Sequence, residues 1–258
     1  MEVNACTGRA NLIISGRSLP AAGRSRESSM TVRVVAGEID SKDVTTRVVL
    51  PTTALPRWLP FQRATETIAT PRRPFPPHRH EGVEVFTYVI EGSATYTYGS
   101  SSADPLESGS TKLLTAPTSA SHAISPRKGR TVRWFSLVVA LPDGRASAPG
   151  LQSSRAVTTD MQPDGTVLEE LVGPRSALKS AAGLECEGIV FVQAGTVFRR
   201  VGHDRRAVVY ALTGPGTIDY DPLDAGEAAF IENSAGVALQ GDAGFRVILC
   251  SAPRTGPA

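Results

Sequence analysis

The chain lacks most of the features that mark membrane, secreted or nucleic-acid-binding proteins. No run approaches the roughly 20 consecutive apolar residues of a transmembrane helix. Its three cysteines, Cys6, Cys186 and Cys250, form no C-x-x-C pair and no even framework, which favours a reducing compartment. The net charge is only +2, and the four arginines and two glutamates of residues 1–29 account for all of it. Residues 30–258 therefore carry no net charge and lack the excess of positive charge that binds nucleic-acid phosphates. We therefore expect a cytoplasmic protein that binds neither membranes nor nucleic acid.

Helix-forming runs are also scarce. The 258 residues include 24 Gly and 19 Pro, and 41% of them are hydrophobic. Recurring Val and Thr between turn residues predict an all-β chain with real cores. Residues 1–29 are rich in Gly, Ser, Ala and Arg. They indicate a disordered tail, or a true translation start at Met30.

The chain contains an internal repeat. "YVIEGSATYTY" at residues 88–98 aligns without a gap with "YALTGPGTIDY" at residues 210–220, at an offset of 210 − 88 = 122. Each copy is typical of a β-hairpin with a glycine in its turn. A closing strand follows each copy, "RWFSLVVALP" in the first and "RVILCSAP" in the second. We interpret the chain as two tandem antiparallel β-barrels or sandwiches.

This repeat sets the expected domains. They are a tail at 1–29, a metal-binding N-terminal domain at 30–145, a linker with the start of the second domain at 146–182, and a metal-free C-terminal domain at 183–258. Within the linker, "VLEEL" at 167–171 predicts a short helix.

Histidines are few and concentrated in the first copy. His78 and His80 stand two apart, so in a strand both project from one face. Glu84 follows four residues after His80, and His122 lies on what should be a neighbouring strand. Three imidazoles and a carboxylate with an open position suit Fe, Mn, Ni, Cu or Zn.

At the repeat offset the second copy carries no such ligands. His78, His80 and Glu84 would fall on Arg200, Gly202 and Arg206. His203 is near but alone, which is more typical of a surface turn. Only the first copy is expected to bind metal.

Two motifs resemble the pirin family of bicupins, within the cupin superfamily. "HRHEGVEVFTYVIEG" follows a pirin stretch of the type H-P-H-R-G-F-E-T-V-T-Y-L-L-E-G. "TAPTSASHAISP" is similar to the second pirin motif, T-A-G-R-G-I-x-H-x-E-x-P. The likeness covers roughly residues 47–252 and is strongest at 74–126. It implies two cupin barrels with one divalent metal, usually Fe(II), in the first.

By this resemblance His78, His80 and His122 are metal ligands. Pirins take a fourth ligand from a Glu two residues after the last His, but Ile124 stands there in this chain. The wider superfamily uses a Glu four residues after H-x-H, and Glu84 occupies that place. We therefore expect either a His₃Glu site or a His₃ site with additional open positions. Alternatively, Glu84 is not a ligand and only orients a ligand histidine by hydrogen bonding.

The family also implies function. Pirins with quercetinase-like activity point to a metal-dependent dioxygenase acting on a flavonol-like or other phenolic substrate, with Glu84 as ligand or catalytic base. The altered second motif leaves a cyclase or isomerase that tailors polyketide-like metabolites as a variant. Some pirins are instead iron-responsive regulators that bind a protein partner, and a metal-free scaffold is a third alternative. A monomer is expected, since one chain already pairs two barrels.

Overall fold

A computed structural model of the chain describes residues 31–40, 45–73, 75–100, 103–144, 148–155 and 157–254. These ranges contain 21 β-strands and no helix. The all-β prediction is therefore confirmed. The described part of the chain holds no helix that could span a membrane. The expected tail at 1–29 and the alternative start at Met30 lie outside the described residues.

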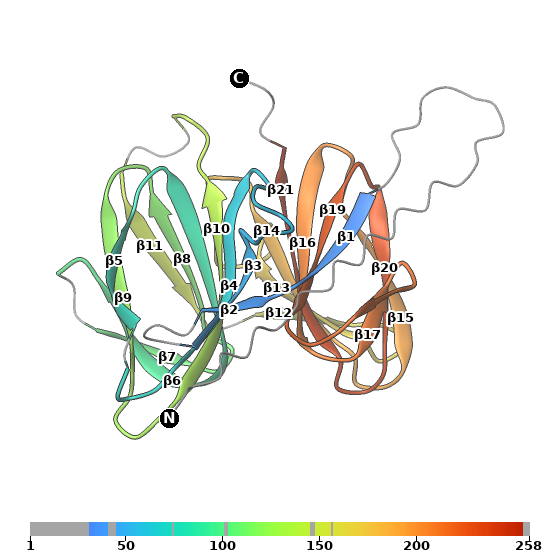
Figure 1. Cartoon of the computed structure of the whole chain (residues 1–258), viewed down its shortest axis with the longest axis horizontal. Helices are drawn as coiled ribbons and strands as arrows, with labels where there is room; N and C mark the ends of the chain where they lie inside the picture. Colours follow the sequence, from blue (N-terminus) through green and yellow to red (C-terminus); the bar gives the residue numbers. More distant parts are fainter. Residues whose placement is uncertain are drawn as a thin grey trace, which may run out of the picture.

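The strands form three sheets, two of them with one broad face each toward the middle of the molecule (Figure 1). The seven-stranded sheet has the order β1 (Thr31–Ala36), β19 (Glu227–Glu232), β16 (Arg205–Thr213), β21 (Arg246–Pro253), β14 (Glu185–Val190), β13 (Val167–Val172), β12 (Thr158–Met161). The four-stranded sheet that closes the second barrel has the order β15 (Gly195–Arg200), β20 (Gly236–Gly241), β17 (Gly216–Ile218), β18 (Asp221–Leu223).

The first barrel is built from a ten-stranded sheet. Its main path is β11 (Gly150–Ser154), β8 (Thr111–Ala116), β6 (Val83–Tyr98), β10 (Val132–Ala140), β4 (Phe61–Ala69), β3 (Thr45–Leu50), β2 (Glu38–Asp40). Three more strands complete it, namely β5 (Phe75–His80), β7 (Asp104–Glu107) and β9 (Ala120–Pro126). The predicted pair of tandem barrels, a bicupin, is confirmed.

Strand β6 shows how the sequence produces this packing. Its apolar run is buried on both faces. Val85 and Val89 face the interior of the first barrel, whereas Phe86, Tyr88 and Ile90 face the second barrel. Side chains of a strand alternate between its faces, so a strand covered on both sides has to be apolar throughout.

The predicted hairpin at 88–98 is wrong, because β6 runs unbroken through Gly92. It pairs with β8 over 83–88 and with β7 and β9 beyond Gly92, so one strand serves both layers of the barrel. Gly92 permits the bend, with a φ of 85°. A Cβ there would lie 2.0 Å from the carbonyl oxygen of Thr131, so only glycine fits.

The two barrels share one hydrophobic core, which contains Phe135, Tyr210 and Phe230. Phe135 and Tyr210 stack across the interface with ring centroids 4.9 Å apart. The Tyr210 hydroxyl donates to Glu66 Oε2 at 2.9 Å, and Arg133 donates to the same oxygen at 2.7 Å. This contact makes the two barrels one packed unit.

Strand pairing crosses the expected domain boundaries. Strand β1 pairs with β19, so residues 31–36 join the second barrel although they were expected in the first domain. Strand β11 pairs with β8 of the first barrel, whereas β12 and β13 pair within the second sheet. The segment 146–182 thus contributes to both barrels.

The short helix predicted at 167–171 is wrong, since Val167–Val172 is strand β13. This strand lies between β12 and β14 and buries Leu168 and Leu171 on opposite faces. Pairing on both sides overrides the local helix propensity of "VLEEL".

Candidate metal centre

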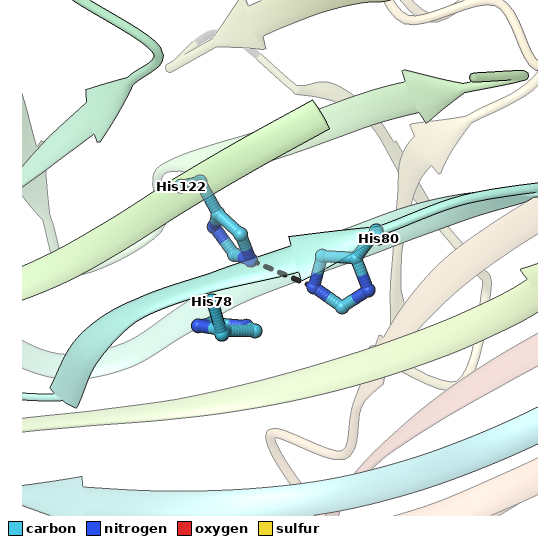
Figure 2. A group of neighbouring side chains, drawn as sticks. All are labelled: His78, His80 and His122. Carbon is cyan, nitrogen blue, oxygen red and sulfur yellow. Dashed lines mark hydrogen bonds between the residues drawn. The ribbon is translucent and has the colours of Figure 1, made fainter. Parts of the chain in front are cut away.

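The three histidines of the first half meet on two adjacent strands. His78 and His80 lie on β5, and His122 lies on β9. The strands are antiparallel, and His78 stands directly opposite His122 in their register. Residues two apart in a strand share a face, so all three imidazoles project to the same side (Figure 2).

Their ring nitrogens converge. One nitrogen from each imidazole lies within 4.8 Å of the others, and no other residue joins this group among those the structure describes. His80 Nε2 and His122 Nε2 are 3.0 Å apart. Two metal–nitrogen bonds of about 2.1 Å at right angles would separate their nitrogens by about 3.0 Å. The His80–His122 pair therefore has the spacing of two imidazoles around one ion.

His78 is held in a defined orientation. Its Nδ1 lies 3.0 Å from the carbonyl oxygen of Pro76, so Nδ1–H donates a hydrogen bond to that oxygen and Nε2 is left free to bind. Such a hydrogen bond fixes the tautomer of a ligand histidine. The ring of Phe75 packs edge-on against His78, with centroids 4.8 Å apart.

The electrostatic environment keeps the imidazoles neutral. Burial, strengthened by repulsion from His78, lowers the pKa of His80 to about 4. Burial also lowers the pKa of His122 to about 3, with further contributions from His78 and His80. The pKa of His78 lies below its usual value because desolvation outweighs its hydrogen bond to Pro76. Neutral imidazole is the form that binds a metal.

Glu84 lies away from this cluster, so the structure does not bring it to the histidines as expected for a ligand or catalytic base. Its carboxylate is fully buried and holds the segment that precedes β14. Oε1 accepts hydrogen bonds from Thr115 Oγ1 at 2.8 Å and from the Ala181 amide at 3.0 Å. Oε2 accepts from the Ala182 amide at 3.1 Å and from the Ser180 hydroxyl. With four donors bound, Glu84 is a structural anchor between two parts of the chain.

No carboxylate replaces Glu84 at the histidines within the described ranges. Ile124 is buried opposite Phe75 and packs in the core of the first barrel. The site therefore consists of three imidazoles beside an apolar wall, and three imidazoles alone would leave a coordination position of a bound metal unfilled.

Tyr96 also lies beside the histidines. The ring of Tyr96 lies 5.0 Å from that of His122, centroid to centroid. The sequence gives no local signal for this contact, because Tyr96 lies on β6 and reaches His122 only through the pairing of β6 with β9.

The second barrel replaces the cluster with other residues. Tyr96 pairs with Ile124 in the first barrel, and Ile218 pairs with Leu239 in the second. Ile124 and Leu239 are therefore equivalent. The residue two positions before each of them is His122 in the first barrel and Val237 in the second, so Val237 is the counterpart of His122. Arg199 pairs with Val237, so it occupies the place of His78. The repeat offset predicts Arg200 as the counterpart of His78, but strand pairing makes the counterpart Arg199, one residue earlier.

Arg199 forms an ion pair that has no counterpart among the first-barrel histidines. It donates to Glu187 Oε2 at 2.6 Å and to Oε1 at 2.7 Å, beside a cavity of about 330 Å³. His203 is exposed and stands outside the histidine cluster. The described part of the second barrel has no group of three potential metal ligands.

Known proteins share the fold of this chain. No family model matches the chain. A pirin-like protein of Caulobacter vibrioides is 27% identical over 185 residues, which are 68% of this chain and 67% of that protein. The crystal structure of a quercetin 2,3-dioxygenase from Acinetobacter baumannii superposes with a TM-score of 0.75 at 19% identity, covering 88% of this chain and 80% of the other. The Escherichia coli pirin YhhW in complex with nickel(II) gives 0.73 at 15% identity, covering 87% and 100%.

Proposed function

Because this chain is a divergent member of the pirin family of bicupins, we propose that it is a metal-dependent enzyme that uses its first barrel to oxidise a small phenolic or enolic substrate. The observation that carries the proposal is the convergence of the three imidazoles of His78, His80 and His122 within 4.8 Å. Fe(II) is the metal we expect, with Mn, Ni, Cu or Zn as alternatives, because imidazole ligands alone do not choose among them.

The proposed reaction is a quercetinase-like dioxygenation, in which both atoms of dioxygen enter the substrate. When bound, the metal would supply Lewis acidity and a route for electrons between substrate and dioxygen. The three neutral imidazoles would hold it through Nε2 atoms. With no carboxylate in the described ligand set, open positions would remain for the substrate oxygen and for dioxygen.

The surroundings of the site narrow the substrate class. Phe75 lies against His78 and, with ring centroids 5.6 Å apart, against Trp134. This aromatic wall suits a planar, aromatic substrate such as a flavonol or another phenol. Since Glu84 is occupied by four donors, it is not available to remove the substrate's proton. The site therefore favours an acidic hydroxyl that ionises readily, as in an enediol or an activated phenol.

Quercetin 2,3-dioxygenases among the structural relatives support this choice. A cyclase or isomerase acting on a polyketide-like enol would use the same metal and the same acidic hydroxyl. We further propose a monomer in a reducing compartment. Cys186 and Cys250 stand opposite each other on β14 and β21, and both are free thiols.

The test is metal analysis after anaerobic loading with Fe(II), followed by oxygen consumption with a panel of flavonols. The wild type should bind close to one metal per chain, and His80→Ala should bind much less. Arg79→Ala is the matched control, because Arg79 lies between the two ligands but donates outward to Ser119 Oγ at 2.8 Å. A wild-type protein that binds no metal after incubation with Fe(II) would refute the proposal. A loaded protein that consumes oxygen with none of the phenols or enols would reject the dioxygenase and leave the isomerase variant.

A further inference from the structure

His122 has a ring nitrogen that lacks a partner. Its Nε2 points toward His80 Nε2, so a metal would bind there and the neutral ring would carry its proton on Nδ1. That Nδ1 is buried and has no hydrogen-bond partner among the described residues. His78 differs, because its Nδ1 has the Pro76 carbonyl. Ligand histidines almost always donate their second N–H to a neighbouring acceptor, so His122 needs one.

The hydroxyl of Tyr96 is a second buried polar group without a partner among the described residues, and it belongs to a ring that neighbours His122. Tyr96 is 1% exposed, and its oxygen also has no hydrogen-bond partner within the part of the chain that is described. Its ring lies 5.0 Å from that of His122 with 38° between the ring planes. Tyr96 faces Ile124 across the β6–β9 pair, which makes it the diagonal neighbour of His122. Diagonal neighbours on one face are within reach of aromatic side chains.

The Tyr96 ring also has a cationic neighbour. The ammonium group of Lys112 lies 5.8 Å from the centre of the Tyr96 ring. Lys112 is fixed in turn by Asp104 and by Ser153 Oγ, the latter at 2.7 Å. The Tyr96 ring therefore has both the ammonium of Lys112 and the imidazole of His122 as neighbours.

We propose that the Tyr96 hydroxyl accepts a hydrogen bond from the Nδ1–H of His122 when the metal is bound, directly after a small rotation of the rings or through one buried water molecule. Each of the two groups supplies what the other lacks, a donor and an acceptor, and leaving both unpaired in a buried site is costly. Tyr96 is then a positioning residue that fixes the tautomer and the aim of His122. This inference rests on the proposed metal site.

The experiment compares the affinity for Zn(II) of the wild type, Tyr96→Phe and Tyr88→Phe, by competition with a chelator. Tyr88 is the matched control, because it lies on the same strand but faces the second barrel, where its hydroxyl accepts from Arg246 at 3.2 Å. Loss of such a supporting hydrogen bond typically weakens metal binding 10- to 100-fold. We expect that loss in Tyr96→Phe, and an unchanged affinity in Tyr88→Phe.

A spectroscopic readout separates positioning from packing. In the Zn(II)-loaded wild type, ¹H–¹⁵N NMR should show the Nδ1 proton of His122 in slow exchange with water. In Tyr96→Phe that signal should shift or be lost to exchange.

The outcomes are distinct. Equal zinc affinity and an unchanged Nδ1 signal in Tyr96→Phe would overturn this inference while leaving the metal site intact. A wild type that binds no zinc or iron would overturn the proposed function, and this inference with it.

Discussion

Replacing Glu84 by alanine should destabilise the protein strongly and leave its metal content unchanged. This outcome would distinguish the role that the structure gives Glu84 from the role that the cupin motif predicts. A ligand would lose metal on substitution. An anchor would lose stability, because Glu84 joins the start of β6 to residues 180–182 ahead of β14.

The magnitude follows from the groups that would lose their acceptor. Two of them are the amides of Ala181 and Ala182, at 3.0 and 3.1 Å from the carboxylate. A buried donor left unsatisfied costs about 1–3 kcal/mol. The hydroxyl of Thr115 can rotate toward another acceptor, so its loss adds less. We expect Glu84→Ala to lower the free energy of unfolding by about 4 kcal/mol. At about 2–4 °C per kcal/mol for a chain of this size, the melting temperature should fall by about 8–16 °C.

The assay combines thermal or urea unfolding of the metal-free protein with metal analysis of loaded samples. Glu81→Ala is the control, because Glu81 is an exposed carboxylate three residues earlier and its loss should change neither quantity. A Glu84→Ala protein of normal stability that no longer binds metal would refute the structural argument. It would restore Glu84 as a ligand.

Three further predictions concern stability. The pKa values of His80 and His122, lowered to about 4 and about 3, mean that below about pH 6.5 the unfolded state binds protons that the native state does not. The stability of the metal-free protein should therefore fall as the pH drops from 6.5 toward 4, and urea midpoints should show a weaker fall in His122→Asn. Tyr210→Phe removes the donor to Glu66 between the barrels and should cost about 1–2 kcal/mol in urea unfolding; an unchanged midpoint would mean that Arg133 alone satisfies that carboxylate. Gly92→Ala should cost about 3 kcal/mol or more, since the residue has a φ of 85° and a Cβ would collide with backbone, and a wild-type melting curve would contradict the assigned bend of β6.

Much of the architecture is local enough to read from sequence. The repeat at an offset of 122 predicts two β units, because equal patterns of apolar residues and turns build equal strands. Tyr88 and Tyr210, which the repeat aligns with each other, both lie in the core shared by the two barrels. Strand partners are a different matter, because they are distant in sequence. Strand β1 pairs with β19 almost 200 residues later, and the sequence of β1, "TVRVVA", does not indicate which strand it will pair with.

The ligand set divides in the same way. His78 and His80 lie within one strand, so the two-residue period of β structure places both on one face, and the sequence determined that by itself. Glu84 lies beyond a turn at Gly82, which has a φ of 67°, and in the next strand. There the alternation starts anew and puts Glu84 on the face of Phe86 and Tyr88, toward the second barrel. The arrival of His122 opposite His78, and of Tyr96 beside it, was decided only by how β5, β6 and β9 pair. Periodicity determines the face of a side chain within a strand, whereas only tertiary packing determines which faces meet.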